Sequence, residues 1–293
     1  MHTDEIKLRF SGARVRFKLY TPSEAVSCRA LFVSGPFGDI ESWERLCRLL
    51  CEKGVLCVCA ELPGFGKCPG NLKTPQNNSA RAAMLWGVLD EVELARGENL
   101  SGWHLVAHGS ACGAIMEMAL SHHECVLSRV FINPVTDRFK KLSGIISSRA
   151  GSFYLKRAAK LYTSASMFAK KMSKLYGKYP IKRRLNVLFK EYSDYAKASV
   201  FKRLICEGYK ISDDAFNIEG PLMLIRGKKD VLFSKREEAF IDRLPDIEMH
   251  IVNAYHMVYE SQPEMTADYL NGWFSFSEGK TKQVFTRKKR EKA

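Results

Sequence analysis

A short run of small residues in the middle of the chain has the composition of a turn that could present a nucleophile. This stretch, VAHGSACGA at 106–114, follows an apolar run and leads into a helical pattern. It offers two reactive side chains, the Ser110 hydroxyl and the Cys112 thiol. A hydroxyl needs a neighbouring general base, whereas a thiol at a helix N-terminus can be activated by its position. Cys112 falls inside the expected helix and is interpreted as a packing residue, so the question is whether Ser110 is reactive.

Continuous apolar runs, separated by amphipathic segments, surround this turn and must position it. Six of them predict strands, at 30–35, 55–62, 103–108, 129–134, 221–227 and 247–253. A run of alternating polar and apolar residues at 13–20 predicts an antiparallel strand with one solvent-exposed face. Helices are expected at 41–54, 78–93 and 110–123. Gly54 and Ser79 suit the C-terminal and N-terminal caps of the first two. Buried strands alternating with helices predict an α/β fold with a mostly parallel, doubly wound sheet.

Four segments along these elements resemble the motifs of the α/β-hydrolase superfamily. LFVSGPFGDIESWERL resembles the strand and loop that carry one oxyanion donor, and AELPGFGKCPG resembles the PDLPGFGRS turn after the next strand. PLMLIRGKKDVLFS resembles the strand and loop that deliver an acid, and NAYHMVYESQPE resembles the loop that delivers a histidine. The similarity covers roughly residues 28–134 and 219–274. It implies an α/β-hydrolase fold with a helical cap, in which Asp230 is the acid and His256 is the histidine.

These two residue types suit acid–base chemistry. An imidazole can take and return a proton near neutral pH, and a carboxylate on its other nitrogen fixes the tautomer and stabilises the imidazolium. Both residues follow expected strands directly, where open α/β sheets bind their ligands. No other histidine of the chain has a comparable setting.

The superfamily pattern Gly-x-nucleophile-x-Gly can be aligned with the turn at 106–114 in two registers. With Ser110 as the nucleophile, the flanking position before it is His108, which is large where the pattern needs a small residue. With Gly109 in the nucleophile slot, the flanks are Ala107 and Ala111, both small. We favour the second register. It predicts a positive φ at Gly109, with Ser110 beginning the helix.

The oxyanion region also departs from the superfamily. The loop after the first buried strand reads Ser34-Gly35-Pro36, and Pro36 stands where the resemblance implies a backbone N–H donor. Proline has no N–H, so one donor is lost. The other donor would be the backbone N–H of Ser110, with Gly35 beside it.

Three interpretations therefore remain open. The first is a hydrolase in which Ser110 is a displaced nucleophile acting with His256 and Asp230. The second is an enzyme that uses the His256–Asp230 pair alone, with no serine chemistry. The third is an inactive member that keeps the fold as a binding protein. We favour a hydrolase, with a small acyl ester or thioester as the substrate that the superfamily implies. We expect it to use no metal and no cofactor.

Positive charge is concentrated in one insert. Residues 138–215 contain 19 Lys/Arg and five Asp/Glu, so this segment alone carries as much net charge as the whole chain, +14. It shows helical periodicity and no strand pattern, which predicts a helical cap. The positive electrostatic field of this segment would attract an acidic carrier protein or an anionic membrane surface. Nucleic acid is not favoured, since no recognised motif is present. The expected division is 1–137 first part of the core, 138–216 basic cap, 217–278 second part of the core, and 279–293 basic disordered tail.

The cysteines and the N-terminus favour a cytoplasmic location. Nine cysteines, an odd number, lie mostly inside apolar runs such as GVLCVCAEL and have no C-x-x-C spacing. This pattern is typical of reduced, buried thiols rather than of a disulfide framework or a zinc site. Asp4, Glu5, Lys7 and Arg9 lie near the N-terminus, where a signal peptide would need an apolar segment.

Overall fold

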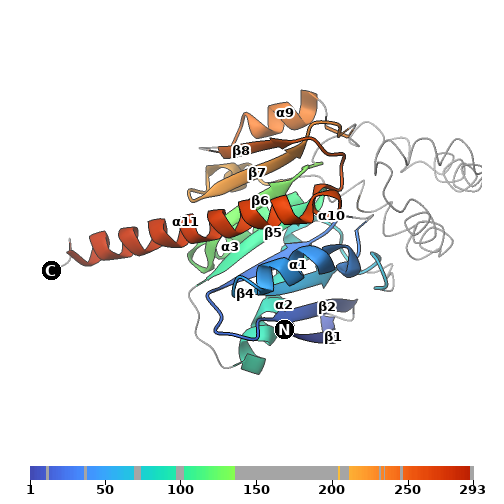
Figure 1. Ribbon diagram of the computed structural model, residues 1–293. Coiled ribbons are helices and arrows are strands. Elements are labelled where there is room, and N and C mark those ends of the chain that lie inside the picture. Colours follow the sequence, from blue (N-terminus) through green and yellow to red (C-terminus); the bar gives the residue numbers. More distant parts are fainter. Residues whose placement is uncertain are drawn as a thin grey trace, which may run out of the picture.

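An eight-stranded sheet forms the centre of the protein (Figure 1). The computed structural model describes residues 1–10, 13–35, 38–68, 74–96, 102–135, 204, 211–230, 232–233, 235–244 and 247–290. The strands are β1 (His2–Phe10), β2 (Ala13–Thr21), β3 (Cys28–Val33), β4 (Val55–Glu61), β5 (Trp103–His108), β6 (Val126–Ile132), β7 (Leu222–Gly227) and β8 (Ile247–Val252). Their order is β1-β2-β4-β3-β5-β6-β7-β8. The strands from β4 to β8 run parallel, and β1 and β2 pair antiparallel at one side. The predicted α/β class and mostly parallel sheet are confirmed.

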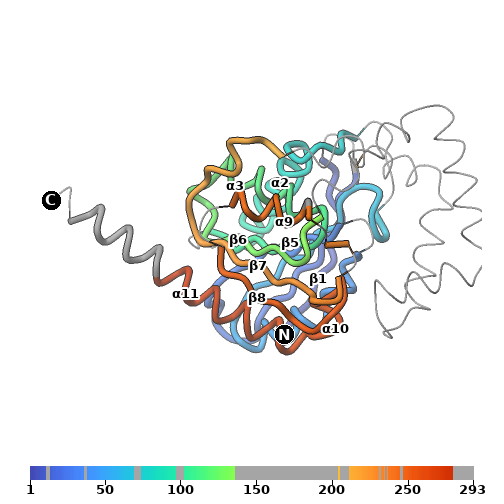
Figure 2. The backbone as a smooth tube through the Cα atoms, turned by 90° about the horizontal axis from the view of Figure 1, so that it is seen from above, coloured from blue at the N-terminus to red at the C-terminus, as the bar shows by residue number. Residues whose placement is uncertain are grey.

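Helices cover both faces of this sheet (Figure 2). They are η1 (Ile40–Trp43), α1 (Glu44–Cys51), α2 (Asn78–Arg96), α3 (Ala111–Ser121), η2 (His123–Cys125), η3 (Asp213–Asn217), α9 (Lys235–Ile241), α10 (Val258–Ser261) and α11 (Pro263–Arg290). One apolar cluster joins the sheet to α2, α3, α9 and η3, and a second joins its other face to α1, α10 and α11. Strands β3, β4 and β5 are buried almost throughout because both faces are covered.

Three local features differ from the sequence-based expectations. Strand β1 was not anticipated, because its charged residues mask the apolar positions Ile6 and Leu8 that pack on the core. Helix α2 is capped by Asn77, whose Oδ1 accepts a hydrogen bond from the Ala80 backbone N–H at 2.8 Å, and not by Ser79. Gly54, in contrast, agrees with its expected place at the C-terminal cap of the preceding helix, because its φ is positive, +84°.

The third difference concerns the C-terminus, where a disordered tail was expected from residue 279. Helix α11 instead continues to Arg290. Lysine, arginine and glutamine are good helix formers, and extending an existing helix is far easier than nucleating a new one. Helical backbone therefore extends beyond the part of α11 that packs on the sheet.

Most of the predicted basic cap lies outside the described residues, as does Cys206. The segment 211–216 at its end is described, and there Ala215 and Phe216 pack in the core of the body. The Ser212 backbone N–H also donates to Glu117 Oε1 of α3, at 2.8 Å. Among the described segments, no helix combines the length and apolar character needed to cross a membrane. The eight cysteines in these segments are free thiols.

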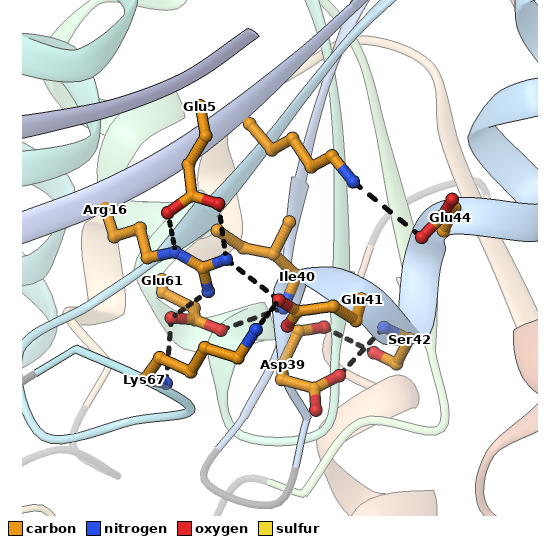
Figure 3. Close-up of polar contacts among 10 residues, drawn as sticks. Glu5, Arg16, Asp39, Ile40, Glu41, Ser42, Glu44, Glu61 and Lys67 are labelled. Carbon is orange, nitrogen blue, oxygen red and sulfur yellow. Dashed lines mark hydrogen bonds and ion pairs between the residues drawn. The ribbon is translucent and has the colours of Figure 1, made fainter. Parts of the chain in front are cut away.

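A buried charge cluster ties the first two strands to the loops after β3 and β4 (Figure 3). Arg16 of β2 is 4% exposed and donates to Glu5 of β1, Glu41 of η1 and Glu61 of β4, at 2.8–3.0 Å. Glu61 in turn accepts hydrogen bonds from the backbone N–H groups of Ile40 and Lys67. Burial raises the pKa of Glu61. Although burial opposes it, hydrogen bonds from Arg16 and Lys67 lower the pKa of Glu41 to about 2. The cluster thereby fixes both loops.

Replacing Arg16 by methionine should destabilise the protein strongly. The substitution leaves the buried Glu61 carboxylate without the arginine that pairs with it, and breaking a buried ion pair typically costs about 3–5 kcal/mol in the free energy of unfolding. Urea unfolding would measure this loss. Arg48→Met is the matched control, because Arg48 forms an exposed pair with Glu44, and such pairs contribute about 0–1 kcal/mol. Equal stabilities for the two variants would mean that the cluster contributes no more than a surface pair.

Candidate active site

The turn at 106–114 is a sharp strand-to-helix turn with Gly109 at its tip. Strand β5 ends at His108, Ser110 is the N-cap of α3, and Gly109 has φ +62°. Two backbone hydrogen bonds fix the turn against β6 and the segment after it. The Gly109 N–H donates to the Ile132 carbonyl, and the Val135 N–H donates to the Gly109 carbonyl, both at 3.1 Å. Glycine adopts this left-handed conformation at little cost. The predicted positive φ at Gly109 and the helix start at Ser110 are present, and the assignment of Gly109 to the nucleophile slot remains a prediction.

The missing side chain of Gly109 would point at His256. A Cβ atom built on Gly109 lies 3.7 Å from His256 Nε2, the nearest described atom outside residues 108–110. A hydroxyl on that carbon would come within hydrogen-bonding reach of the imidazole. The ring therefore faces the place where a nucleophile would stand.

His256 is held by Asp230, as the motif resemblance implied. His256 Nδ1 lies 2.9 Å from Asp230 Oδ2, and the Asp230 side chain is fully buried. The other carboxylate oxygen of Asp230 accepts the Leu232 backbone N–H at 2.9 Å. A carboxylate can only accept, so Nδ1 carries a proton, and in the neutral ring Nε2 presents its lone pair to the space beside Gly109. Asp230 follows β7 and His256 follows β8, so both lie at the carboxyl ends of the strands. The expected hydrogen bond is present, and a catalytic role remains a prediction.

Asn133, which the sequence analysis did not single out, fixes the loop that carries His256. It follows β6 directly, and its φ of 44° is unusual for a residue other than glycine. Its Nδ2 donates to the His256 carbonyl at 2.6 Å, and its Oδ1 accepts the Gly227 backbone N–H at 2.8 Å. His108 Nε2 also lies 3.1 Å from the His256 carbonyl oxygen. The sequence signal that could have identified Asn133 is the Asn-Pro pair at the end of a buried strand.

A stacked aromatic pair supports the other side of the site. Trp43 and Tyr259 stack with ring centroids 3.7 Å apart, and Trp43 Nε1 donates to Ser34 Oγ at 2.7 Å. The Tyr259 ring also meets the edge of His108 at 5.1 Å between centroids. These contacts join the loop after β3 to the helix that follows His256.

Ser110 faces Gly35 rather than His256. Its side chain is buried, and its Oγ forms no hydrogen bond with any residue that the structure describes. A Cβ atom built on Gly35 would lie 3.1 Å from Ser110 Oγ and 3.2 Å from the Ser110 backbone nitrogen. Gly35 and the Ser110 N–H therefore adjoin, as expected for an oxyanion region. Pro36, the other predicted member of that region, lies outside the described residues.

Cys112 has no setting for nucleophilic chemistry. It is fully buried inside α3, and its Sγ contacts the Ala107 carbonyl at 3.4 Å. Burial raises the pKa of this thiol well above its usual value, which keeps it protonated. Its interpretation as a packing residue agrees with this environment.

Comparison with known proteins identifies the fold. No family model matches the sequence, and a comparison with curated proteins also finds no match. Solved structures do match. A probable hydrolytic enzyme from Pseudomonas aeruginosa has a TM-score of 0.70 at 16% identity, over 93% of this chain and 94% of its own. Proline iminopeptidase from Mycobacterium smegmatis has a TM-score of 0.70 at 14% identity, over 95% of this chain and 100% of its own.

A carboxylesterase from Bacillus subtilis is similar to the same extent, with a TM-score of 0.66 at 16% identity, over 93% of this chain and 92% of its own. At such low identities the likeness defines the fold and not the reaction. The strand order, the helices on both faces and the glycine turn after β5 agree with it. The chain has the α/β-hydrolase fold.

Proposed function

We propose that the protein is a hydrolase of acyl esters or thioesters in which the His256–Asp230 pair activates a water molecule. One observation carries this proposal: His256 Nε2 lies 3.7 Å from the position where a side chain of residue 109 would begin. In a serine enzyme of this fold that position holds the nucleophilic hydroxyl. A water molecule fits the space that a hydroxymethyl group would fill, and it can donate a hydrogen bond to the same general base.

The reaction then follows from the groups present. His256 Nε2 takes a proton from water as the water oxygen attacks the acyl carbonyl carbon. Asp230 stabilises the resulting imidazolium. The Ser110 backbone N–H, beside Gly35, donates to the developing oxyanion. When the tetrahedral intermediate collapses, the C–O or C–S bond breaks, and His256 returns its proton to the leaving alcohol or thiol. The products are the free acid and that alcohol or thiol.

Ser110→Ala separates this mechanism from one with a displaced serine. We expect kcat/KM for p-nitrophenyl acyl esters and acyl thioesters to stay within about twofold of the wild-type value, because the variant removes no group that touches the reacting atoms. The natural protein should also label poorly with a fluorophosphonate probe, which needs an activated serine. Strong labelling that Ser110→Ala abolishes would instead identify Ser110 as the nucleophile.

The same geometry favours one second function. Because residue 109, which faces His256 Nε2, is glycine and offers no nucleophile, the imidazole could take a proton directly from a substrate carbon. A protein that hydrolyses no ester or thioester, yet catalyses His256-dependent exchange of substrate hydrogen with deuterated solvent, would have this function. A protein with neither activity would be a binding protein with a retained histidine–aspartate pair.

A further inference from the structure

Three metal-ligating side chains meet at the end of the sheet opposite the His256–Asp230 pair. They are Cys28, the first residue of β3, His104 of β5 and Glu278 of α11. One ligand atom from each lies within 4.8 Å of the other two. In a tetrahedral zinc site, with bonds of about 2.0–2.3 Å, ligand atoms lie about 3.3–3.8 Å apart. A shift of about 1 Å, within the reach of a glutamate rotamer, would therefore bring the three to zinc distances.

The topology explains why these side chains converge. Strands β3 and β5 are parallel neighbours with Ala30 opposite His104. Side chains two residues apart share a face of a strand, so Cys28 and His104 both belong to the face that α11 covers. The ring of Phe274 on α11 stacks on His104, with centroids 4.2 Å apart. Glu278 follows Phe274 by one helical turn, which places its carboxylate beside the imidazole.

The surroundings of His104 are those of a metal-binding histidine. The residue is fully buried, and its Nδ1 lies 2.8 Å from Ser128 Oγ. Its Nε2 is buried with no hydrogen-bond partner among the described residues, and it lies 3.9 Å from Glu278 Oε1, too far for a hydrogen bond. Metal-binding histidines typically bond through one ring nitrogen while a hydrogen bond at the other fixes the tautomer. Burial also lowers the pKa of His104, which favours the neutral ring that a metal needs.

We propose that Cys28, His104 and Glu278 form a zinc site that clamps α11 to the starts of β3 and β5. One soft thiolate, one imidazole and one carboxylate suit Zn²⁺, and water would complete the tetrahedron. Burial raises the pKa of the Cys28 thiol to about 12, so the thiol releases its proton to solvent when the cation binds. No spacing pattern indicates this site, because its three residues are far apart along the chain.

Zinc titration of the purified, metal-stripped full chain tests the site. Isothermal titration calorimetry should show one Zn²⁺ per chain, and Co²⁺ should give a thiolate-to-cobalt charge-transfer absorption. Cys28→Ser and Glu278→Gln should each weaken Zn²⁺ binding at least about 10-fold, and Cys28→Ser should remove the absorption. Both are conservative changes at positions that are only part-buried, so the variants should fold. Ser128→Ala, which keeps all three ligands, should weaken binding by about 10–100-fold.

Two control variants should bind Zn²⁺ as the natural chain does. Cys125→Ser removes another part-buried thiol. His250→Gln removes an imidazole that stacks on Tyr269 of α11, as His104 stacks on Phe274, but that belongs to no cluster of three metal-binding side chains among the described residues. At about 100 times its Kd, Zn²⁺ should also raise the Tm of the natural chain by about 5 °C, and it should leave the Tm of Cys28→Ser unchanged.

Two results would overturn the proposal. The first is that the natural chain binds no Zn²⁺. The second is that Cys28→Ser binds it as tightly while Cys47→Ser does not. The cation would then belong to the core thiols Cys47 and Cys59, whose Sγ atoms lie 3.3 Å apart.

Discussion

Gly109→Ser should convert the protein into one that a fluorophosphonate probe labels rapidly. The new side chain begins 3.7 Å from His256 Nε2, so its hydroxyl can donate to an imidazole that Asp230 already orients. We expect the labelling rate to rise by about 10²–10⁴-fold, the contribution of a positioned general base. The φ of +62° would strain a serine by about 1–2 kcal/mol, which a folded domain can absorb. Active-site titration and mass spectrometry of the labelled peptide would measure the effect.

Gly109→Ala is the matched control for this gain. It has the same backbone strain and the same added Cβ but no hydroxyl, so it should not label. It should also lower ester or thioester hydrolysis, because its methyl group occupies the proposed water position. A folded Gly109→Ser protein that labels no faster than Gly109→Ala would contradict the alignment of His256 with the nucleophile slot.

His256→Gln should remove the activity of the natural protein. Without the imidazole no described group stands beside Gly109 to take a proton from water, so kcat should fall by about 10²–10⁴-fold. Asp230→Asn should also lower kcat, because an amide in place of the carboxylate no longer stabilises the imidazolium. Substrate affinity should change little in either variant, which separates lost chemistry from lost binding. Steady-state kinetics with p-nitrophenyl acyl esters and acyl thioesters would measure both parameters.

His250→Gln is the control for these variants. His250 lies on β8, the strand that leads to His256, and pairs with Glu248 away from the site, so its loss should leave kcat unchanged. If folded His256→Gln retained full activity, the histidine–aspartate pair would have no part in the reaction. The proposed mechanism would then be wrong, although the fold would stand.

The sequence by itself determined the α/β class and the residues at the strand ends. Continuous apolar runs specify strands that are buried on both faces, whatever their order in the sheet. The small residues around Gly109 specify a tight strand-to-helix turn, because a larger side chain cannot fit where strand and helix pass close together. The motifs around Asp230 and His256 place both residues just after strands, and parallel strands bring such positions to one edge. These features depend on the size and hydrophobicity of residues that are close together in the sequence, so they can be predicted from it directly.

Only the tertiary structure decided which side chains meet across elements. It places Ser110 beside Gly35 and Gly109 opposite His256, the register that residue spacing favoured without excluding the other. It brings Asn133 onto the His256 loop, and it places Cys28 and His104 beside α11. It also recruits the charged strand β1, whose burial depends on pairing with β2. Such contacts join segments that are distant along the chain. They follow from strand order, register and helix placement, which are fixed when the whole sheet buries its two apolar faces together.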